Sequence, residues 1–250
     1  MGYPRLLLAS LAFLLATTAT GQSFYFGIKG GPTLATQKWD QSFQRDPLLR
    51  YHFIAFTESY SEEDRYALFA QLGYHVKGSS IRTYRSTVQL PDGTYRDFPA
   101  RVIPFKFNNL ALSLGGKQKF PLGATSKAYY MFGIRGEYTV STNLRPAGLE
   151  VNDPYYTIYP FEEYVRPWTF GAIAGAGVEF PFSELVAGLI EFTVNPDFTR
   201  QYDQPRIDNV INPNPDFGGG TITIPERQIM NVTFEMTLGL RFLRKVIYID

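Results

Sequence analysis

Cysteine is absent from the 250 residues, and histidine occurs only twice, at His52 and His75. Without cysteine, the chain has no disulfides, no thiolate nucleophile, no iron–sulfur cluster and no cysteine-ligated zinc. Charged residues make up 19% of the chain, and 24 basic residues nearly cancel 23 acidic ones. This balance gives no basic surface excess for a nucleic-acid partner, so we expect none. Aromatic residues are abundant instead, with 17 Tyr and 21 Phe.

The one long apolar run lies at the start of the chain. Arg5 precedes the run Leu6 to Ala16, and Ala19-Thr20-Gly21 then places small residues at a cleavage site, which is the pattern of a secretory signal peptide. The run of about 11 residues is too short to span a bilayer as a helix, which needs about 20. We therefore expect residues 1–21 to be a cleaved signal peptide and residues 22–250 to form the mature domain.

From Phe24 onward, apolar and polar residues alternate with a period of two, which is typical of β-strands. In the last such segment, Met236, Leu238 and Leu240 oppose Thr237 and Gly239. The segment 49–59 is the least regular, because Ile54 and Phe56 share a face with Glu58. The predicted strands are the segments 24–29, 49–59, 66–77, 102–120, 130–140, 168–180, 186–195 and 230–242.

The segment 102–120 changes the phase of its alternation. Phe105 and Phe107 lie on one parity, whereas Leu110 and the leucines after it lie on the other. One extra residue accounts for such a change, so the pattern predicts a β-bulge near Asn108-Asn109.

Short and long connections between the segments alternate strictly. The short connections are 61–65, 121–127 and 183–185, and the long ones are about 36–48, 78–101, 141–165 and 199–225. A soluble β-sandwich also alternates, but its strands are usually shorter than these. Aromatic residues at the strand ends, such as Tyr66, Tyr138 and Trp168, resemble interfacial girdles. The sequence therefore predicts an all-β fold: a transmembrane antiparallel up-and-down β-barrel of about eight strands, with short periplasmic turns and long extracellular loops.

Three segments carry a family resemblance. They are Gly21 to Gly31, the pair Leu110 to Lys119 with Tyr129 to Tyr138, and the final Thr237 to Phe242. On these the chain resembles the PorT-like outer-membrane β-barrel proteins of Bacteroidota. The resemblance implies an outer-membrane location in a Gram-negative cell and insertion by the barrel-insertion machinery. The best-known member is implicated in type IX secretion, but most relatives have no assigned activity.

Charged residues occupy the polar row of the predicted strands and should point into the lumen, together with Gln71 and Lys77. An eight-stranded barrel is only wide enough for side chains to fill, and buried charges of opposite sign should pair. We expect a structural network of ion pairs that seals the lumen; an ion pathway or gate is the alternative. The predicted network consists of Lys29, Lys117, Arg135, Glu137, Glu179, Glu191, Glu235 and Arg241.

Catalytic and metal-binding motifs are weak. His52 and His75 fall near strand ends on neighbouring segments, where Glu58 or Ser79 could come near, but there is no Gly-x-Ser-x-Gly motif. We expect interfacial or loop-facing histidines, no enzymatic activity and no cofactor. Four loop acids could bind Ca²⁺, but their spacing fits no EF-hand, so solvated acids are expected. These acids are Asp197, Asp203, Asp208 and Asp216.

The long loops remain as the functional part of the molecule, because function on rigid scaffolds tends to lie in loops. We expect a non-enzymatic barrel that contributes to envelope integrity or binds a partner through its loops, with a secretion component among the candidates. Outer-membrane lipid should surround the barrel. A lipid-modifying enzyme that uses His52 or His75, and a narrow channel, are the alternatives.

Overall fold

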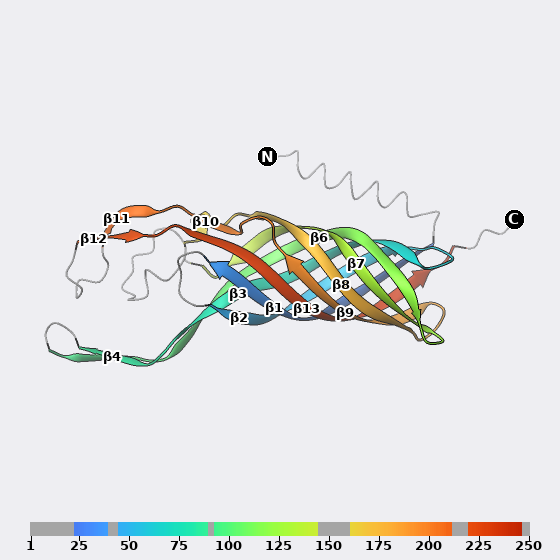
Figure 1. Cartoon of the computed structure of the whole chain (residues 1–250), viewed down its shortest axis with the longest axis horizontal. Helices are drawn as coiled ribbons and strands as arrows, with labels where there is room; N and C mark the ends of the chain where they lie inside the picture. The colour runs from blue at the N-terminus through green and yellow to red at the C-terminus, as the bar shows by residue number, and fades with distance from the viewer. Residues whose placement is uncertain (1–22, 40–44, 90–92, 145–160, 212–219, 247–250) are drawn as a thin grey trace.

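The computed structural model describes residues 23–39, 45–89, 93–144, 161–211 and 220–246, so the predicted signal peptide lies outside the described residues. Eight long antiparallel strands form one sheet in the order β1-β2-β3-β6-β7-β8-β9-β13, and β13 pairs with β1 to close the barrel (Figure 1). The barrel strands are β1 Phe24–Trp39, β2 Asp46–Ser59, β3 Tyr66–Thr83, β6 Arg101–Leu122, β7 Ser126–Thr142, β8 Trp168–Pro181, β9 Val186–Pro196 and β13 Arg227–Arg244.

Successive barrel strands are neighbours in the sheet, and the connections between them differ in length. Residues 60–65, 123–125 and 182–185 make the short connections, which we place at the short-turn end; the opposite end is the long-loop end. The prediction of an all-β, up-and-down barrel of about eight strands is therefore confirmed. In the described ranges, no helix is both long and apolar enough to cross a membrane.

Large apolar side chains cover the outside of the barrel. They alternate with buried residues along each strand, and many of these buried residues are polar or charged, so the outer face is apolar and much of the inner face is polar. Leu68 and Ile134, for example, are 72% and 69% exposed. An exposed apolar surface that runs around a closed barrel is the surface expected in contact with lipid. Further members are Phe26, Ile28, Phe53, Leu72, Leu112, Leu114, Phe132, Phe170, Phe192, Met236 and Leu238.

Strand β6 keeps one facing along its whole length, so the predicted change of phase within it is wrong. Phe105 and Phe107 are 1% and 0% exposed and point inward, whereas Leu110 and Leu112 on the opposite parity point outward. The alternation looked shifted because the inward row of β6 changes from apolar to polar along the strand. Apolarity therefore does not mark the outer face at the long-loop end.

The irregular pairing predicted near Asn108-Asn109 is present, but the extra residue belongs to the neighbouring strand. Asn108 pairs with Ser141 and Asn109 pairs with Thr139. The intervening Val140 of β7 has no partner in this register, so β7 carries the bulge.

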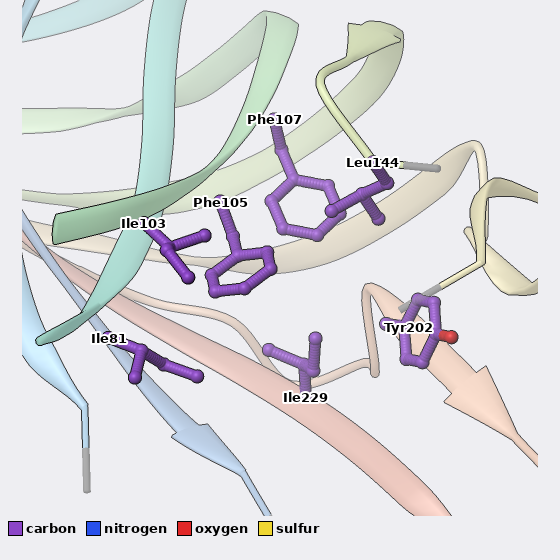
Figure 2. Packing of buried hydrophobic residues seen from close by; sticks show 7 residues of the cluster. All are labelled: Ile81, Ile103, Phe105, Phe107, Leu144, Tyr202 and Ile229. Carbon is purple, nitrogen blue, oxygen red and sulfur yellow. The ribbon is translucent and has the colours of Figure 1, made fainter. Parts of the chain in front are cut away.

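An apolar cluster, the long-loop core, fills the barrel interior at the long-loop end (Figure 2). Trp39, Tyr164 and Val165 pack against it. The indole of Trp39 lies 5.8 Å from the Phe105 ring and 6.1 Å from the Tyr202 ring, centroid to centroid. The core consists of Ile81, Ile103, Phe105, Phe107, Leu144, Tyr202 and Ile229.

Two ribbons extend beyond the barrel at the long-loop end (Figure 1). One is the pair β4 (Ser86–Gln89) and β5 (Tyr95–Phe98), which continues from β3 and β6. The other is the pair β11 (Ile207–Ile211) and β12 (Thr221–Ile224). Between β9 and β11, the short strand β10 (Tyr202–Gln204) pairs with the start of β13, and the 3-10 helix η1 (Glu162–Tyr164) lies beside it.

Candidate functional site

The barrel interior holds the principal concentration of charged side chains in the described structure. All eight residues of the predicted network lie on inward rows and are buried, from 1% exposure for Glu179 and Glu235 to 8% for Arg241. Eight-stranded barrels have interiors that side chains can fill, which brings opposing walls into contact. The ion pairs of the lumen form two groups, one toward each end of the barrel.

The lower cluster lies toward the short-turn end and is built from alternating acids and bases. Lys29 Nζ lies 2.5 Å from Glu191 Oε1, and Lys117 Nζ lies 2.5 Å from Glu58 Oε1 and 3.6 Å from Glu191 Oε2. The Tyr129 hydroxyl donates to Glu191 Oε2 at 2.9 Å. The cluster consists of Lys29, Glu58, Asp64, Lys117, Lys119, Lys127, Glu179, Glu191 and Arg241.

The lower cluster continues to the mouth of the barrel. Arg241 Nη1 lies 2.8 Å from Glu179 Oε2, and Lys119 Nζ lies 3.1 Å from Glu179 Oε1 and 3.0 Å from Asp64 Oδ1. Lys127 Nζ lies 2.7 Å from the other oxygen of Asp64. Burial raises the pKa of Asp64, but the charge of Lys119 and the hydrogen bonds from both lysines together lower it by more, so that the pKa lies below its ordinary value.

A pocket of about 200 Å³ opens at this short-turn mouth. Its walls carry Tyr25, Asp64 and Lys127, together with Glu179 and Arg241 of the lower cluster. The guanidinium carbon of Arg241 lies 4.0 Å from the centroid of the Tyr25 ring. Acids and bases line this pocket together, and their charges are already paired with one another.

The upper cluster lies toward the long-loop end. Lys77 Nζ lies 2.8 Å from both Glu137 Oε2 and Asp197 Oδ1. Arg135 Nε lies 2.5 Å from Glu137 Oε1, and Arg135 Nη1 lies 3.6 Å from Glu235 Oε1. The space next to Arg135 and Glu235 has no room for a water-sized sphere. Side chains therefore seal the lumen at this level.

The two histidines are buried in the lumen, so the expectation of interfacial or loop-facing histidines is wrong. His52 and His75 are each 3% exposed, and their rings stack with centroids 5.5 Å apart and planes 7° apart. His75 Nδ1 lies 2.7 Å from Glu235 Oε1. The ring nitrogens of His52 lie 2.9 Å from the hydroxyl oxygens of Thr33 and Thr237. Both histidines are on inward rows, which the sequence pattern itself indicates.

Glu58 and Lys119 are network members that the predicted set omits. Lys119 lies two residues after Lys117 and so has the same facing, which extension of the alternation would have revealed. Glu58 shares the inward row of β2 with Ile54 and Phe56, which are themselves buried in the lumen. Because this row contains apolar residues, the sequence pattern did not identify it as the inward face of β2.

Asp197 differs from the expected solvated carboxylates, whereas Asp208 is exposed, as expected. Asp197 is 6% exposed and belongs to the upper cluster, Asp203 pairs with Arg166, and Asp208 pairs with Arg206. Asp216 lies outside the described residues. Within the described ranges, no group of three or more His, Asp or Glu side chains is arranged to hold a metal ion.

A closed ring of eight antiparallel strands with an apolar outside and a charged inside defines a transmembrane β-barrel of the outer-membrane type. No protein-family model matches the sequence, and no curated protein matches it either. The resemblance to PorT-like proteins therefore remains a prediction.

Several solved structures are similar to the chain. The outer membrane protein OprG from Pseudomonas aeruginosa is 8% identical with a TM-score of 0.47, and the match covers 90% of this chain and 97% of that one. The N-terminal β-barrel domain of Pseudomonas aeruginosa OprF is 12% identical with a TM-score of 0.38, covering 90% and 100%. The outer membrane protease OmpT from Escherichia coli is 11% identical with a TM-score of 0.43, covering 90% and 98%.

The last of these structures corrects one expectation from the sequence. Absence of a catalytic motif led us to expect no enzymatic activity, but the similar structures include a protease. Enzymes and proteins without enzymatic activity share barrels of this kind, so a barrel architecture does not exclude catalysis.

Proposed function

We propose that the protein is exported with a signal peptide over residues 1–21 and resides in the outer membrane, where residues 22–250 form a sealed barrel. The strands and loops at the long-loop end then face outward and bind another component of the cell envelope. The resemblance to PorT-like proteins makes a secretion component one candidate for that partner. The barrel itself contacts outer-membrane lipid and is inserted by the barrel-insertion machinery.

The filled lumen is the observation that carries this proposal. Two buried clusters of ion pairs and the long-loop core occupy the interior, so the barrel offers no solute pathway. An apolar outer face of the barrel supports a membrane location. With the interior sealed, the surfaces left for specific recognition are those that extend beyond the barrel.

The ribbon β4–β5 supports a binding role at the long-loop end. It projects away from the barrel (Figure 1); Tyr84, just before β4, and Tyr95 of β5 are 78% and 71% exposed. Large exposed aromatic residues on a projecting element are common at protein interfaces. Because both side chains are exposed, neither is buried in the barrel interior.

A ribbon-deletion variant tests the proposal. Thr83 and Arg101 pair directly, so an Asn-Gly turn can replace residues 84–100 and leave the barrel strands intact. Cells that lack the protein should be sensitive to detergent. Expression of the wild type or of the control Ala124→Ser should restore resistance, whereas expression of the deletion variant should not. Restoration by a deletion variant that migrates as a folded, heat-modifiable barrel would refute the binding role of the ribbon.

A further inference from the structure

The upper cluster contains one acid more than it has permanent bases. Lys77 and Arg135 provide two positive charges, whereas Glu137, Asp197 and Glu235 provide three negative ones. All five side chains are at least nine-tenths buried. A net charge in a buried site is costly, so the cluster favours a state in which one further positive charge or one proton is present.

Apart from Lys29 of the lower cluster, which pairs with Glu191, the side chains around this cluster that hydrogen-bond to one another are neutral among the described residues. The charged groups nearest to the two histidines are Arg135, Glu137 and Glu235, and Lys29 of the lower cluster also acts on His52. The remaining neighbours are neutral. They are Gln37 of β1, Ser79 of β3, Asn109 of β6, Thr193 and Asn195 of β9, Asn231 of β13, and Gln201.

The His75–Glu235 pair provides one place for the missing proton. Their 2.7 Å contact is a charge-assisted hydrogen bond when the pair holds a proton and the ring is an imidazolium. His52 stacks on His75 and has only hydroxyl partners, which a neutral imidazole satisfies with one donor and one acceptor nitrogen. A second imidazolium parallel to the first would be repelled. His52 therefore stays neutral beside the pair.

Asp197 provides the second place, and it connects the cluster to the long-loop end. Burial raises its pKa above the ordinary value; Lys77 opposes that rise and Glu137 adds to it. Of the three carboxylates, Asp197 alone lies outside the barrel strands, directly after β9. Its backbone N–H donates to Asn231 O at 2.9 Å, and the Asn231 amide donates to Asp197 Oδ2 at 2.8 Å.

Residues 197–201 lie at the long-loop end of the lumen, where Asp197 and Gln201 are buried and Phe198 is exposed. Gln201 is fully buried; its backbone N–H donates to Ile229 O at 2.9 Å, and its side chain donates to Asn109 Oδ1 at 3.2 Å. We propose that the upper cluster holds one exchangeable proton, shared between the His75–Glu235 pair and Asp197, and that loss of this proton releases residues 197–201 from the mouth. Glu137 and Glu235 are fixed on barrel strands, so the excess negative charge expels Asp197.

The direction of the switch follows from which state holds the proton. The closed mouth requires the protonated cluster, so closure is maintained at low pH and is lost as the pH rises and the proton leaves to water. This device acts on the barrel mouth alone and does not depend on the identity of any partner at the ribbons.

Hydrogen exchange in the full-length protein, reconstituted in lipid vesicles, tests the proposal. The amides of Asp197 and Gln201 report on the closing segment, and the amide of Leu240, toward the short-turn end of β13, is the internal control. Between about pH 6 and about pH 9, a range that brackets histidine titration, the protection of the first two should fall by at least about tenfold after correction for intrinsic exchange. Protection at Leu240 should stay constant.

Two variants remove the excess acid and should abolish the pH dependence. Glu235→Gln and Asp197→Asn each leave two acids against two bases, and the second keeps an oxygen that can accept from Asn231. Glu184→Gln, on an exposed turn at the other end, should behave as the wild type. A wild-type protein with pH-independent protection would overturn the proposal. So would retention of the wild-type pH dependence in Asp197→Asn, which serves as the test even if Glu235→Gln fails to fold.

Discussion

Replacement of Arg135 by alanine should destabilise the barrel strongly without creating a channel. The guanidinium lies 2.5 Å from Glu137 and 3.6 Å from Glu235 and is 3% exposed. Its removal changes the balance of the upper cluster from two bases against three acids to one against three. Breaking a buried ion pair by removal of one partner typically costs about 3–5 kcal/mol, because it leaves an uncompensated buried charge.

The cost should fall in the upper part of this range, because two carboxylates lose a partner at once. Glu137 keeps Lys77 at 2.8 Å and Glu235 keeps His75 at 2.7 Å, so neither becomes wholly unpaired and the barrel can still form. Conductance should stay at the level of the wild type, because the long-loop core still blocks the interior.

Urea unfolding in lipid vesicles, followed by tryptophan fluorescence and heat-modifiable migration, measures the free energy of unfolding. Arg135→Lys is the matched control, because it keeps the charge and loses only the forked geometry, so its loss should be smaller. Planar bilayers measure conductance on the same preparations. A loss below about 1 kcal/mol, the value typical of exposed pairs, would refute the buried-network reasoning. A folded Arg135→Ala barrel that conducts ions would show that the network is a gate.

Three further predictions concern the lipid face, the short-turn mouth and the location. Leu238→Arg places a charge on the outward row of β13, where the side chain is 59% exposed, and should cost about 2–4 kcal/mol in vesicle unfolding if it lies at the bilayer midplane. Thr237→Ser keeps the hydroxyl that contacts His52 and should be nearly silent; equal tolerance at both positions would contradict the assigned facing. The pKa of Asp64 in the folded protein lies below its ordinary value near 3.8, so the ionised carboxylate stabilises the fold when the pH is above that ordinary value. This stabilisation is lost as the pH falls through the pKa of the folded state. In a plot of the unfolding midpoint against pH, Asp64→Asn should therefore show a smaller decrease at acid pH than the wild type. The protein should fractionate with the outer membrane, cleaved near Gly21, and recovery from the soluble periplasmic fraction would contradict the proposed location.

The alternation of apolar and polar residues was enough to predict the barrel and, for most residues, which side chains point outward and which point inward. The barrel strands carry apolar outer rows, and much of the inner row is polar, as at Met236 and Leu238 against Thr237, so the period of two is readable without any tertiary information. The rule failed where the interior itself is apolar. Phe105 and Phe107 face inward, and a one-dimensional pattern cannot distinguish apolar contact with lipid from apolar contact with a core.

The partners within the lumen could not be predicted from the sequence. Lys29 pairs with Glu191, 162 positions away, and His75 pairs with Glu235, 160 positions away. These contacts depend on the stagger of the strands around the closed barrel, which the alternation does not determine. Asp64 and Asp197 lie in connections, where no periodicity indicates whether a side chain turns inward.

The pairing of β1 with β13 has a kinetic consequence. Ser23 and Val246, which flank the two strands, are hydrogen-bonded across 223 positions of sequence, so the seam closes only after nearly the whole chain is available. Contacts between residues so distant form slowly, because the loop-closure entropy must be overcome before the contacts contribute. Until then β1 and β9 each present an open strand edge that can pair with another molecule. We therefore expect a chain shortened before β13 to aggregate during export rather than to persist as a smaller barrel.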